Sequence, residues 1–229
     1  MQLYASLEGY GVYAVAAPHR VRNLRIINAA DFSTRAAAPG SLLSVIGGRV
    51  TGARSGAFRH PVLAASDTES QIQLSFDAAG STVALSLETA AGVVLRQLPL
   101  QSVSPAILVS RDGAPMLWDA DTGLPIDLRN VAHSNGRIQV WATGLGKVRP
   151  EWPAGLAAPF ENPPSPVAQV RAMLDGAPVQ VTRATLLPGH IGFYLIELQL
   201  PAIVNAGQSE LYLSADGQES NRVQVVIEP

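Results

Sequence analysis

Alternation of polar and apolar side chains is the feature that most constrains this chain. The alternation runs through four segments, at residues 71–76, 137–142, 196–200 and 223–225. A period of two gives a strand one buried face and one solvated face, which is typical of antiparallel sheets. No stretch shows a sustained 3.6-residue period, and the 20 glycines and 17 prolines disfavour long helices. We therefore predict an all-β protein.

The two halves of the chain also resemble each other. Residues 38–47 match 134–142 at a shift of about 95 residues, a spacing of domain size. Turn, strand, loop, strand, hairpin and closing strand then follow in the same order in both halves. Two tandem immunoglobulin-like antiparallel β-sandwiches explain this order better than one large sheet. The expected parts are an N-terminal extension or edge strand at 1–22, a first sandwich at 23–104, and a second at 105–229 with a proline-rich insertion at 150–166.

Composition excludes several classes of function. Sixteen basic residues against 18 acidic ones give a net charge of −2, so no overall field attracts nucleic acid or anionic lipid. The chain has no cysteine, which excludes disulfides, thiolate zinc sites and thiol catalysis. No apolar run reaches the roughly 18 residues of a membrane-spanning helix. Residues 1–17 lack the basic start of a secretory signal.

Four motifs carry a resemblance to a known family. They are Ile27–Phe32, Ala38–Leu42, Trp141–Gly146 and Leu187–Tyr194, in that order along the chain. This series resembles the uncharacterised C-terminal domain family of acidobacterial secreted and surface proteins, which typically reads INAASF, APGSL, ATGLG and LAPGFVGLYQ. The resemblance extends over residues 24–229, and the chain departs from the family pattern at 54–60 and 119–133.

The resemblance implies two immunoglobulin-fold modules of the IPT/TIG type. Because members of the family are usually exported, it also implies an extracytoplasmic location, in the periplasm or at the cell surface. The family brings no catalytic residues to carry over. Its glycines, such as Gly40, Gly144 and Gly146, suit turns and close backbone approaches. We therefore interpret the shared motifs as scaffold.

Patterns for catalysis and for cofactor binding are missing. The sequence contains no Gly-x-Ser-x-Gly, no Ser-x-x-Lys and no glycine-rich phosphate loop. Asp119 and Asp121 alternate ahead of Gly123 as carboxylates do in a calcium loop, but the third aspartate and the distal glutamate of such a loop are absent. A hairpin turn with solvated aspartates is the interpretation that we favour, and the two aspartates are only weak candidates for metal ligands. We predict no enzyme activity, no cofactor and no complete metal site.

Aromatic residues make up only 6% of the chain, so their positions are informative. Trp141 falls between the apolar positions Val140 and Ala142 and is expected to point away from the core. Trp152 lies in a proline-bounded loop beside Arg149. These residues, together with Tyr194, are candidates for a contact surface. Alternatively, the insertion folds back and covers Trp141 with Trp152, forming a small cluster of its own.

Three hypotheses of function follow. The leading one is a non-catalytic protein–protein interaction subunit of an extracytoplasmic or membrane-associated assembly, because open sandwiches present unpaired strand edges to a partner. The second is a carbohydrate-binding module that uses Trp141, Trp152 and Tyr194. The third is a calcium-dependent enzyme with Asp119 and Asp121 as metal ligands.

Overall fold

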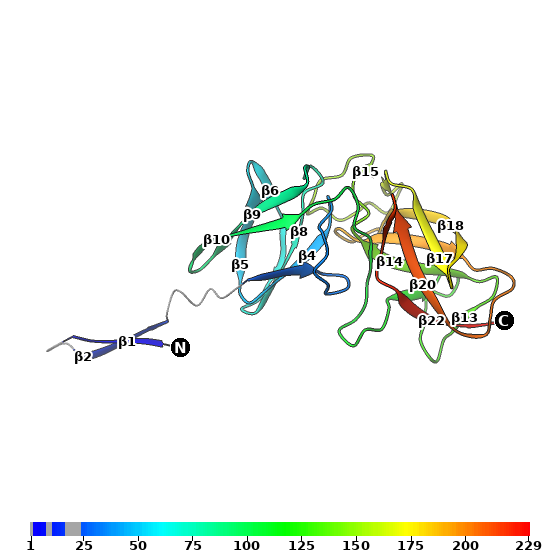
Figure 1. The fold of residues 1–229 in the computed structure, drawn as a ribbon, viewed down its shortest axis with the longest axis horizontal. Helices are drawn as coiled ribbons and strands as arrows, with labels where there is room; N and C mark the ends of the chain where they lie inside the picture. The colour runs from blue at the N-terminus through cyan, green and yellow to red at the C-terminus, as the bar shows by residue number, and fades with distance from the viewer. Residues whose placement is uncertain (1, 8–10, 17–23) are drawn as a thin grey trace.

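The computed structural model describes residues 2–7, 11–16 and 24–229, which form strands and turns and no helix (Figure 1). The predicted all-β class is therefore confirmed, and two tandem antiparallel β-sandwiches make up the body of the molecule. Within the described residues, no helix has the length and apolarity that crossing a bilayer requires. Ahead of the body, β1 (Gln2–Leu7) and β2 (Gly11–Ala16) form a separate antiparallel hairpin.

The first sandwich consists of two four-stranded antiparallel sheets. One sheet has the order β3 (Arg25–Asn28), β4 (Leu42–Ile46), β8 (Glu69–Gln73) and β7 (Val62–Ala65). The other has the order β10 (Gly92–Pro99), β9 (Thr82–Thr89), β5 (Val50–Ser55) and β6 (Phe58–His60). Their facing side chains form one hydrophobic cluster, with Val45, Ile72, Leu74, Leu85 and Leu87 fully buried.

The second sandwich is a ten-stranded sheet that folds over on itself at the long strand β18 (Ala177–Leu186). On one side of β18 lie β19 (Tyr194–Gln199), β14 (Arg137–Thr143), β11 (Ala106–Ile107) and β12 (Leu117–Asp119). On the other lie β17 (Val170–Leu174), β20 (Gly207–Ala215), β21 (Gln218–Glu219), β22 (Val223–Glu228) and β13 (Ala132–His133). A register shift between Val181 and Arg183 marks the fold in β18.

The register of β14 and β19 confirms the predicted burial phase. Ile138 lies opposite Leu198, and Val140 lies opposite Ile196. All four side chains are buried in the core of the second sandwich. Trp141 points to the other face, as the alternation predicts.

The motifs behind the family resemblance meet at the junction between the sandwiches. The Thr143 hydroxyl accepts a hydrogen bond from the Leu42 amide (3.2 Å) and donates one to the Gly192 carbonyl (3.0 Å). Gly192 has a φ of 72°, and a β-carbon there would lie 2.7 Å from the Leu42 side chain. Three distant motifs therefore pack around one buried hydroxyl, which supports the interpretation of these motifs as scaffold.

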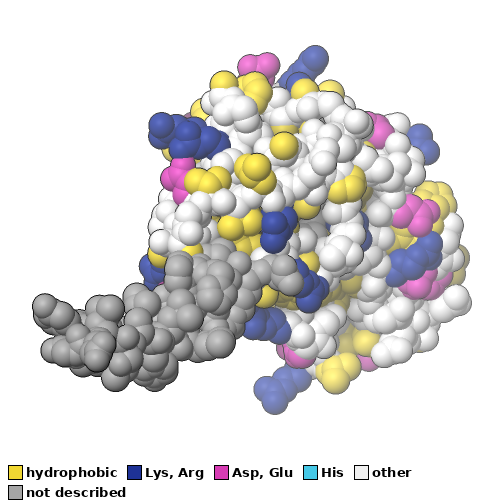
Figure 2. Space-filling model, turned by 60° about the vertical axis from the view of Figure 1, so that its left-hand side comes forward, with side chains coloured by type: hydrophobic (Ala, Val, Ile, Leu, Met, Phe, Trp, Pro, Cys, Tyr) yellow, Lys and Arg dark blue, Asp and Glu magenta, His cyan; other side chains and the backbone are white. Residues whose placement is uncertain are grey.

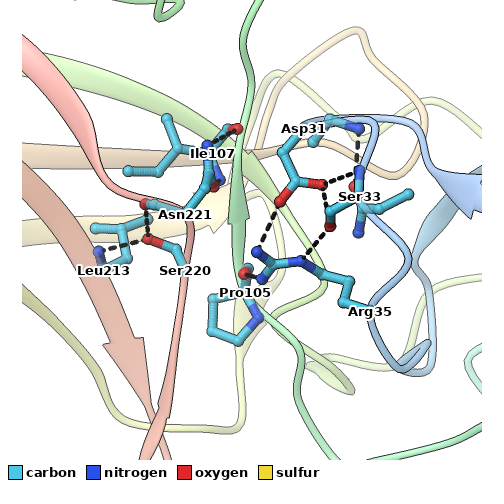
Figure 3. Close-up of polar contacts among 10 residues, drawn as sticks. Asp31, Ser33, Arg35, Pro105, Ile107, Leu213, Ser220 and Asn221 are labelled. Atoms are coloured by element: carbon cyan, nitrogen blue, oxygen red, sulfur yellow. Dashed lines mark hydrogen bonds and ion pairs between the residues drawn. The ribbon is translucent and has the colours of Figure 1, made fainter.

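Side chains of the first half tie the two sandwiches together. The Arg35 guanidinium forms an ion pair with Asp31 (2.6 Å) and donates to the backbone carbonyl of Pro105 (Figure 3). Beside the junction but within the second sandwich, Asn221 accepts a hydrogen bond from the Ile107 amide (2.7 Å) and donates to the Ile107 carbonyl (3.1 Å), as a neighbouring strand would. Phe76, from the first half, is buried in the core of the second sandwich. The two sandwiches are thus joined by more than the connecting chain.

Candidate functional site

An interdomain cleft of about 650 Å³ opens between the loop Ser75–Asp77 of the first sandwich and the segment Lys147–Ala154 of the second, with Val167 at its edge. Two of the residues singled out in the sequence, Arg149 and Trp152, line this cleft. We refer to it below as the interdomain cleft. Trp141 and Tyr194 do not contribute to it.

Charged side chains of both signs line the interdomain cleft. Lys147 and Arg149 carry positive charge, and Asp77 and Glu151 carry negative charge. All four are exposed, and within residues 24–229 none of them forms an ion pair. On the face that Figure 2 shows, basic and acidic groups are scattered among hydrophobic and other side chains. The cleft therefore holds a concentration of unpaired charge at the junction.

Trp152 gives the interdomain cleft an aromatic wall. The side chain is half-buried, packs against the core of the second sandwich, and donates its indole N–H to the Leu156 carbonyl (3.2 Å). Arg149 is held next to it by a short ladder in which β15 (Val148–Arg149) pairs with β16 (Ser165–Pro166). Val148 of this ladder is buried and Arg149 is exposed, so the alternation of the strand directs the arginine outward.

His60 supports the opposite wall of the interdomain cleft from below. Its Nδ1 accepts the Ser75 amide hydrogen (3.0 Å), and its Nε2 lies 2.8 Å from the Ser55 hydroxyl. Burial lowers the pKa of His60 from 6.5 to about 4, so the ring is neutral at pH 7. Sequence reasoning missed this role, since the 14 residues between His60 and Ser75 carry no motif that joins them.

Ser55 and His60 are residue types that can act as nucleophile and general base, but the His60 ring is in the tautomer that prevents this. Because Nδ1 accepts the Ser75 amide hydrogen, Nε2 carries the ring proton and donates it to Ser55. A protonated Nε2 has no lone pair with which to remove the hydroxyl hydrogen of Ser55. The pair therefore supports the loop and does not activate a nucleophile.

A second cavity, of about 330 Å³, adjoins the interdomain cleft and shares Lys147 and Val167 with it. Aliphatic side chains dominate its lining: Pro39, Ala78, Leu100, Val103, Leu145 and Ala168. We call this cavity the apolar extension. Together the two form a groove along the junction, with charges and an indole at one end and aliphatic walls at the other.

Trp141 belongs to a different cluster. Its ring stacks on Trp118, with centroids 3.9 Å apart, and lies 5.2 Å from His190 and 6.4 Å from Phe193. The alternative in which Trp152 covers Trp141 is therefore wrong, because Trp118 of β12 already occupies that position. The insertion instead folds back onto the turn at 188–190, where the Ala158 amide donates to the His190 carbonyl (2.9 Å).

The expectation that Tyr194 lies on a contact surface is wrong. The side chain is fully buried, and its hydroxyl donates to the Gly146 carbonyl at 2.5 Å. Burial raises the pKa of the phenol, so it remains protonated. The alternation of the strand could have predicted this burial, since Tyr194 lies on the same face as the buried residues Ile196 and Leu198.

Asp119 and Asp121 lie in a turn that uses their oxygens. One Asp119 oxygen accepts the amide hydrogens of Thr122 (2.7 Å) and Asp121 (2.9 Å), and these bonds lower the pKa of Asp119. The Asp121 carboxylate forms an ion pair with Arg137. Among the described residues, no group of three or more histidine or acidic side chains is placed to hold a metal ion. The hairpin turn is the interpretation that this geometry favours.

Comparison with known proteins yields fold-level likenesses only. No family model and no curated protein matches the chain, so the resemblance to the acidobacterial family remains a prediction. Among solved structures, SGBP-B of the mixed-linkage glucan utilization locus of Bacteroides ovatus aligns at a TM-score of 0.38 and 12% identity, over 85% of this chain and 44% of that one. SGBP-B from a complex xyloglucan utilization locus of Bacteroides uniformis aligns at a TM-score of 0.31 and 10% identity, over 88% of this chain and 48% of that one. The I9-I11 tandem of titin aligns at a TM-score of 0.27 and 4% identity, over 82% of this chain and 59% of that one. The chain thus spans about half the length of these proteins, and likenesses this distant carry no argument about what it binds.

Proposed function

We propose that this chain is a non-catalytic binding module whose interdomain cleft holds an extended segment of a partner protein. The observation that carries the proposal is the continuous groove along the junction. It joins unpaired charges of both signs, Trp152 and an aliphatic cavity. A polypeptide supplies the complements of all three, namely charged groups, apolar side chains and backbone hydrogen-bonding groups.

The apolar extension favours a polypeptide over a sugar chain. Its lining is dominated by aliphatic side chains such as Leu100 and Leu145, and a cavity of about 330 Å³ holds a leucine-sized or larger side chain without strain. Val167, which is 54% exposed, stands where this cavity meets the interdomain cleft. Burying it under a partner removes apolar surface from water, at about 25 cal/mol per Å².

The rest of the proposal concerns the setting of the module. The resemblance to a family of secreted and surface proteins supports an extracytoplasmic location, within a larger surface or membrane-associated assembly. The tautomer of His60 and the hydrogen bonds of Asp119 support a module without catalysis. We propose no nucleic-acid partner, because the net charge is −2.

The test uses a random peptide library selected against the intact protein. We expect enriched peptides to bind wild type and to lose at least ten-fold in affinity for Arg149→Glu, which reverses one exposed charge of the interdomain cleft. Arg129→Glu is the matched control, since Arg129 is an exposed arginine of the same sandwich outside the cleft. Peptides that bind both variants as tightly as wild type, or a selection that enriches nothing, would overturn the proposal.

An oligosaccharide is the second candidate, and one observation favours it. Trp152 stands beside Asp77, Glu151 and Arg149, and a sugar ring can stack on an indole while its hydroxyls bond to such groups. Titration with polysaccharides, followed by tryptophan fluorescence, tests this candidate. The glycan becomes the better proposal if two results are found together. Tryptophan fluorescence changes saturably with a polysaccharide in wild type and not in Arg149→Glu, and the peptide selection enriches nothing.

A further inference from the structure

The strand β10 forms an open edge of the first sandwich. In its sheet it pairs with β9 and, among the described strands, with no other. Among the described residues, backbone hydrogen bonds cover only its end, where Ala37 bonds to the chain at Pro99 and Gln101. An open strand edge presents backbone N–H and C=O groups that can pair with another strand.

The hairpin geometry shows which backbone groups face outward. Thr89 and Gly92 flank a two-residue loop, so they form the hydrogen-bonded pair that closes the hairpin. In an antiparallel ladder, hydrogen-bonded and non-hydrogen-bonded pairs alternate. Val93, Leu95 and Gln97 are therefore the residues whose N–H and C=O groups point to the open edge.

The side chains of these three residues are unusual for an edge strand. Val93 is 62% exposed and Leu95 is 72% exposed, and Gln97 is exposed but uncharged. The one charged residue of β10, Arg96, has the opposite parity and donates to the backbone carbonyls of Leu24 (3.0 Å) and Leu95 (2.9 Å) of its own chain. Arg96 is therefore the one charge that β10 brings to its open edge, where charges are a common protection against pairing, and both of its hydrogen bonds are made to backbone carbonyls of its own chain.

We infer that β10 is a self-association edge, at which two copies of this chain pair their β10 strands antiparallel around a two-fold axis at Leu95. In this register Leu95 lies opposite Leu95 of the second copy, and Val93 lies opposite Gln97. The outward N–H and C=O groups of all three residues then find partners. The Leu95 carbonyl has a second lone pair and can accept this bond in addition to the one from Arg96. The four-stranded sheet that contains β10 in one copy then joins the same sheet of the second copy, and together they form one eight-stranded sheet.

A second copy is the occupant that the strand itself favours. A two-fold axis places identical positions together, so a strand is self-complementary when its central position is apolar and its flanking positions do not repel. Leu95 meets the first condition, and the Val93–Gln97 pairs meet the second. The contact is independent of the interdomain cleft, because none of the three residues lines it.

The chain has no cysteine, so single cysteine variants report the register directly. In Leu95→Cys the two sulfurs face each other across a hydrogen-bonded pair, whose Cα atoms are about 5.5 Å apart and within disulfide range. We expect this variant to form a covalent dimer on mild oxidation. Val93→Cys is the register control, since its copies lie four residues apart along the ladder, and Ile203→Cys, at a 91% exposed site, controls for random collision.

Sedimentation velocity of the unmodified protein gives the second measurement. Pairing of two edges buries less than a standard interface of about 1,600 Å², so we expect a reversible dimer in the micromolar range. Leu95→Lys should be monomeric with unchanged thermal stability, while Leu128→Lys, at another exposed leucine, should dimerise like wild type. A wild type that stays monomeric, or a Leu95→Cys variant that cross-links no faster than Ile203→Cys, overturns the inference.

Discussion

At the scale of single residues, burial decides which side chains are able to act. Tyr194 and His60 are polar aromatic residues that a sequence offers as ligands or catalysts, yet both are sealed in the interior by backbone hydrogen bonds. Arg149 is the reverse case, an ordinary arginine that the short β15–β16 ladder turns into the cleft. Residue type alone does not show whether such a side chain is buried or exposed, because its polar atoms can find hydrogen-bond partners in either place.

His60 should make the stability of the first sandwich depend on pH. Unfolding restores the ordinary pKa of 6.5, whereas the folded value is about 4, so the unfolded chain binds more protons between these values. Stability is therefore full above pH 6.5 and falls as the pH drops toward 4, by about 2 kcal/mol between pH 7 and pH 5. Urea unfolding at a series of pH values measures this.

The matched variant for this prediction is His60→Asn. An asparagine Oδ1 can accept the Ser75 amide hydrogen as Nδ1 does, but it does not titrate. We expect His60→Asn to lose most of the pH 7 to pH 5 difference, and the exposed His133→Asn to retain it. Equal slopes in all three proteins would contradict the assignment.

At the scale of elements, the strands and their faces follow from the alternation, and the turns follow from local hydrogen bonding. The strand β14 buries the side chains that its period predicts because a pleated strand has two faces and a sandwich has one core. The interpretation of Asp119 and Asp121 remained open in the sequence because a capped turn and a calcium loop use the same residue types. The structure separates the two through the partners of their oxygens.

Removal of divalent cations should therefore leave the protein unchanged. With Asp119 bonded to two amides and Asp121 paired with Arg137, we expect thermal unfolding to give the same Tm in EDTA and in millimolar calcium. Asp119→Ala, in contrast, should cost about 1 kcal/mol through the lost turn bonds. A Tm raised by calcium in wild type and not in Asp119→Ala would restore the metal hypothesis.

At the scale of the whole molecule, the junction is the decisive feature. Thr143 and Phe76 connect the sandwiches by buried contacts and Arg35 by a partly buried one, and these contacts place the two walls of the interdomain cleft at a set distance. A site between two loosely tethered modules would lose part of its binding free energy to ordering them. The scaffold motifs and the proposed function are linked in this way.

A junction of this kind should make the two sandwiches unfold together. We expect calorimetry of wild type to show one transition. Gly192→Ala adds a β-carbon against Leu42 at a positive φ, so it should cost about 1–3 kcal/mol and separate the transition into two. Gly176→Ala has a similar φ of 79° and open space around it, and should destabilise the protein without splitting the transition. Two transitions in wild type would contradict a coupled junction.

By itself, the sequence determined the all-β class, the buried face of the main strands and the interpretation of its glycine motifs as scaffold. These features depend on residues close together in the sequence, because a strand alternates every second residue and a turn is made by neighbouring residues. Which motifs meet, and which polar atoms are left unpaired, was decided by tertiary structure. Leu42, Thr143 and Gly192 meet only because the two sandwiches pack end to end. Arg149 and Asp77 line one cleft only because that junction brings their loops together. Contacts between residues so far apart depend on how the sheets stack, and nothing in the local pattern of side chains encodes that geometry.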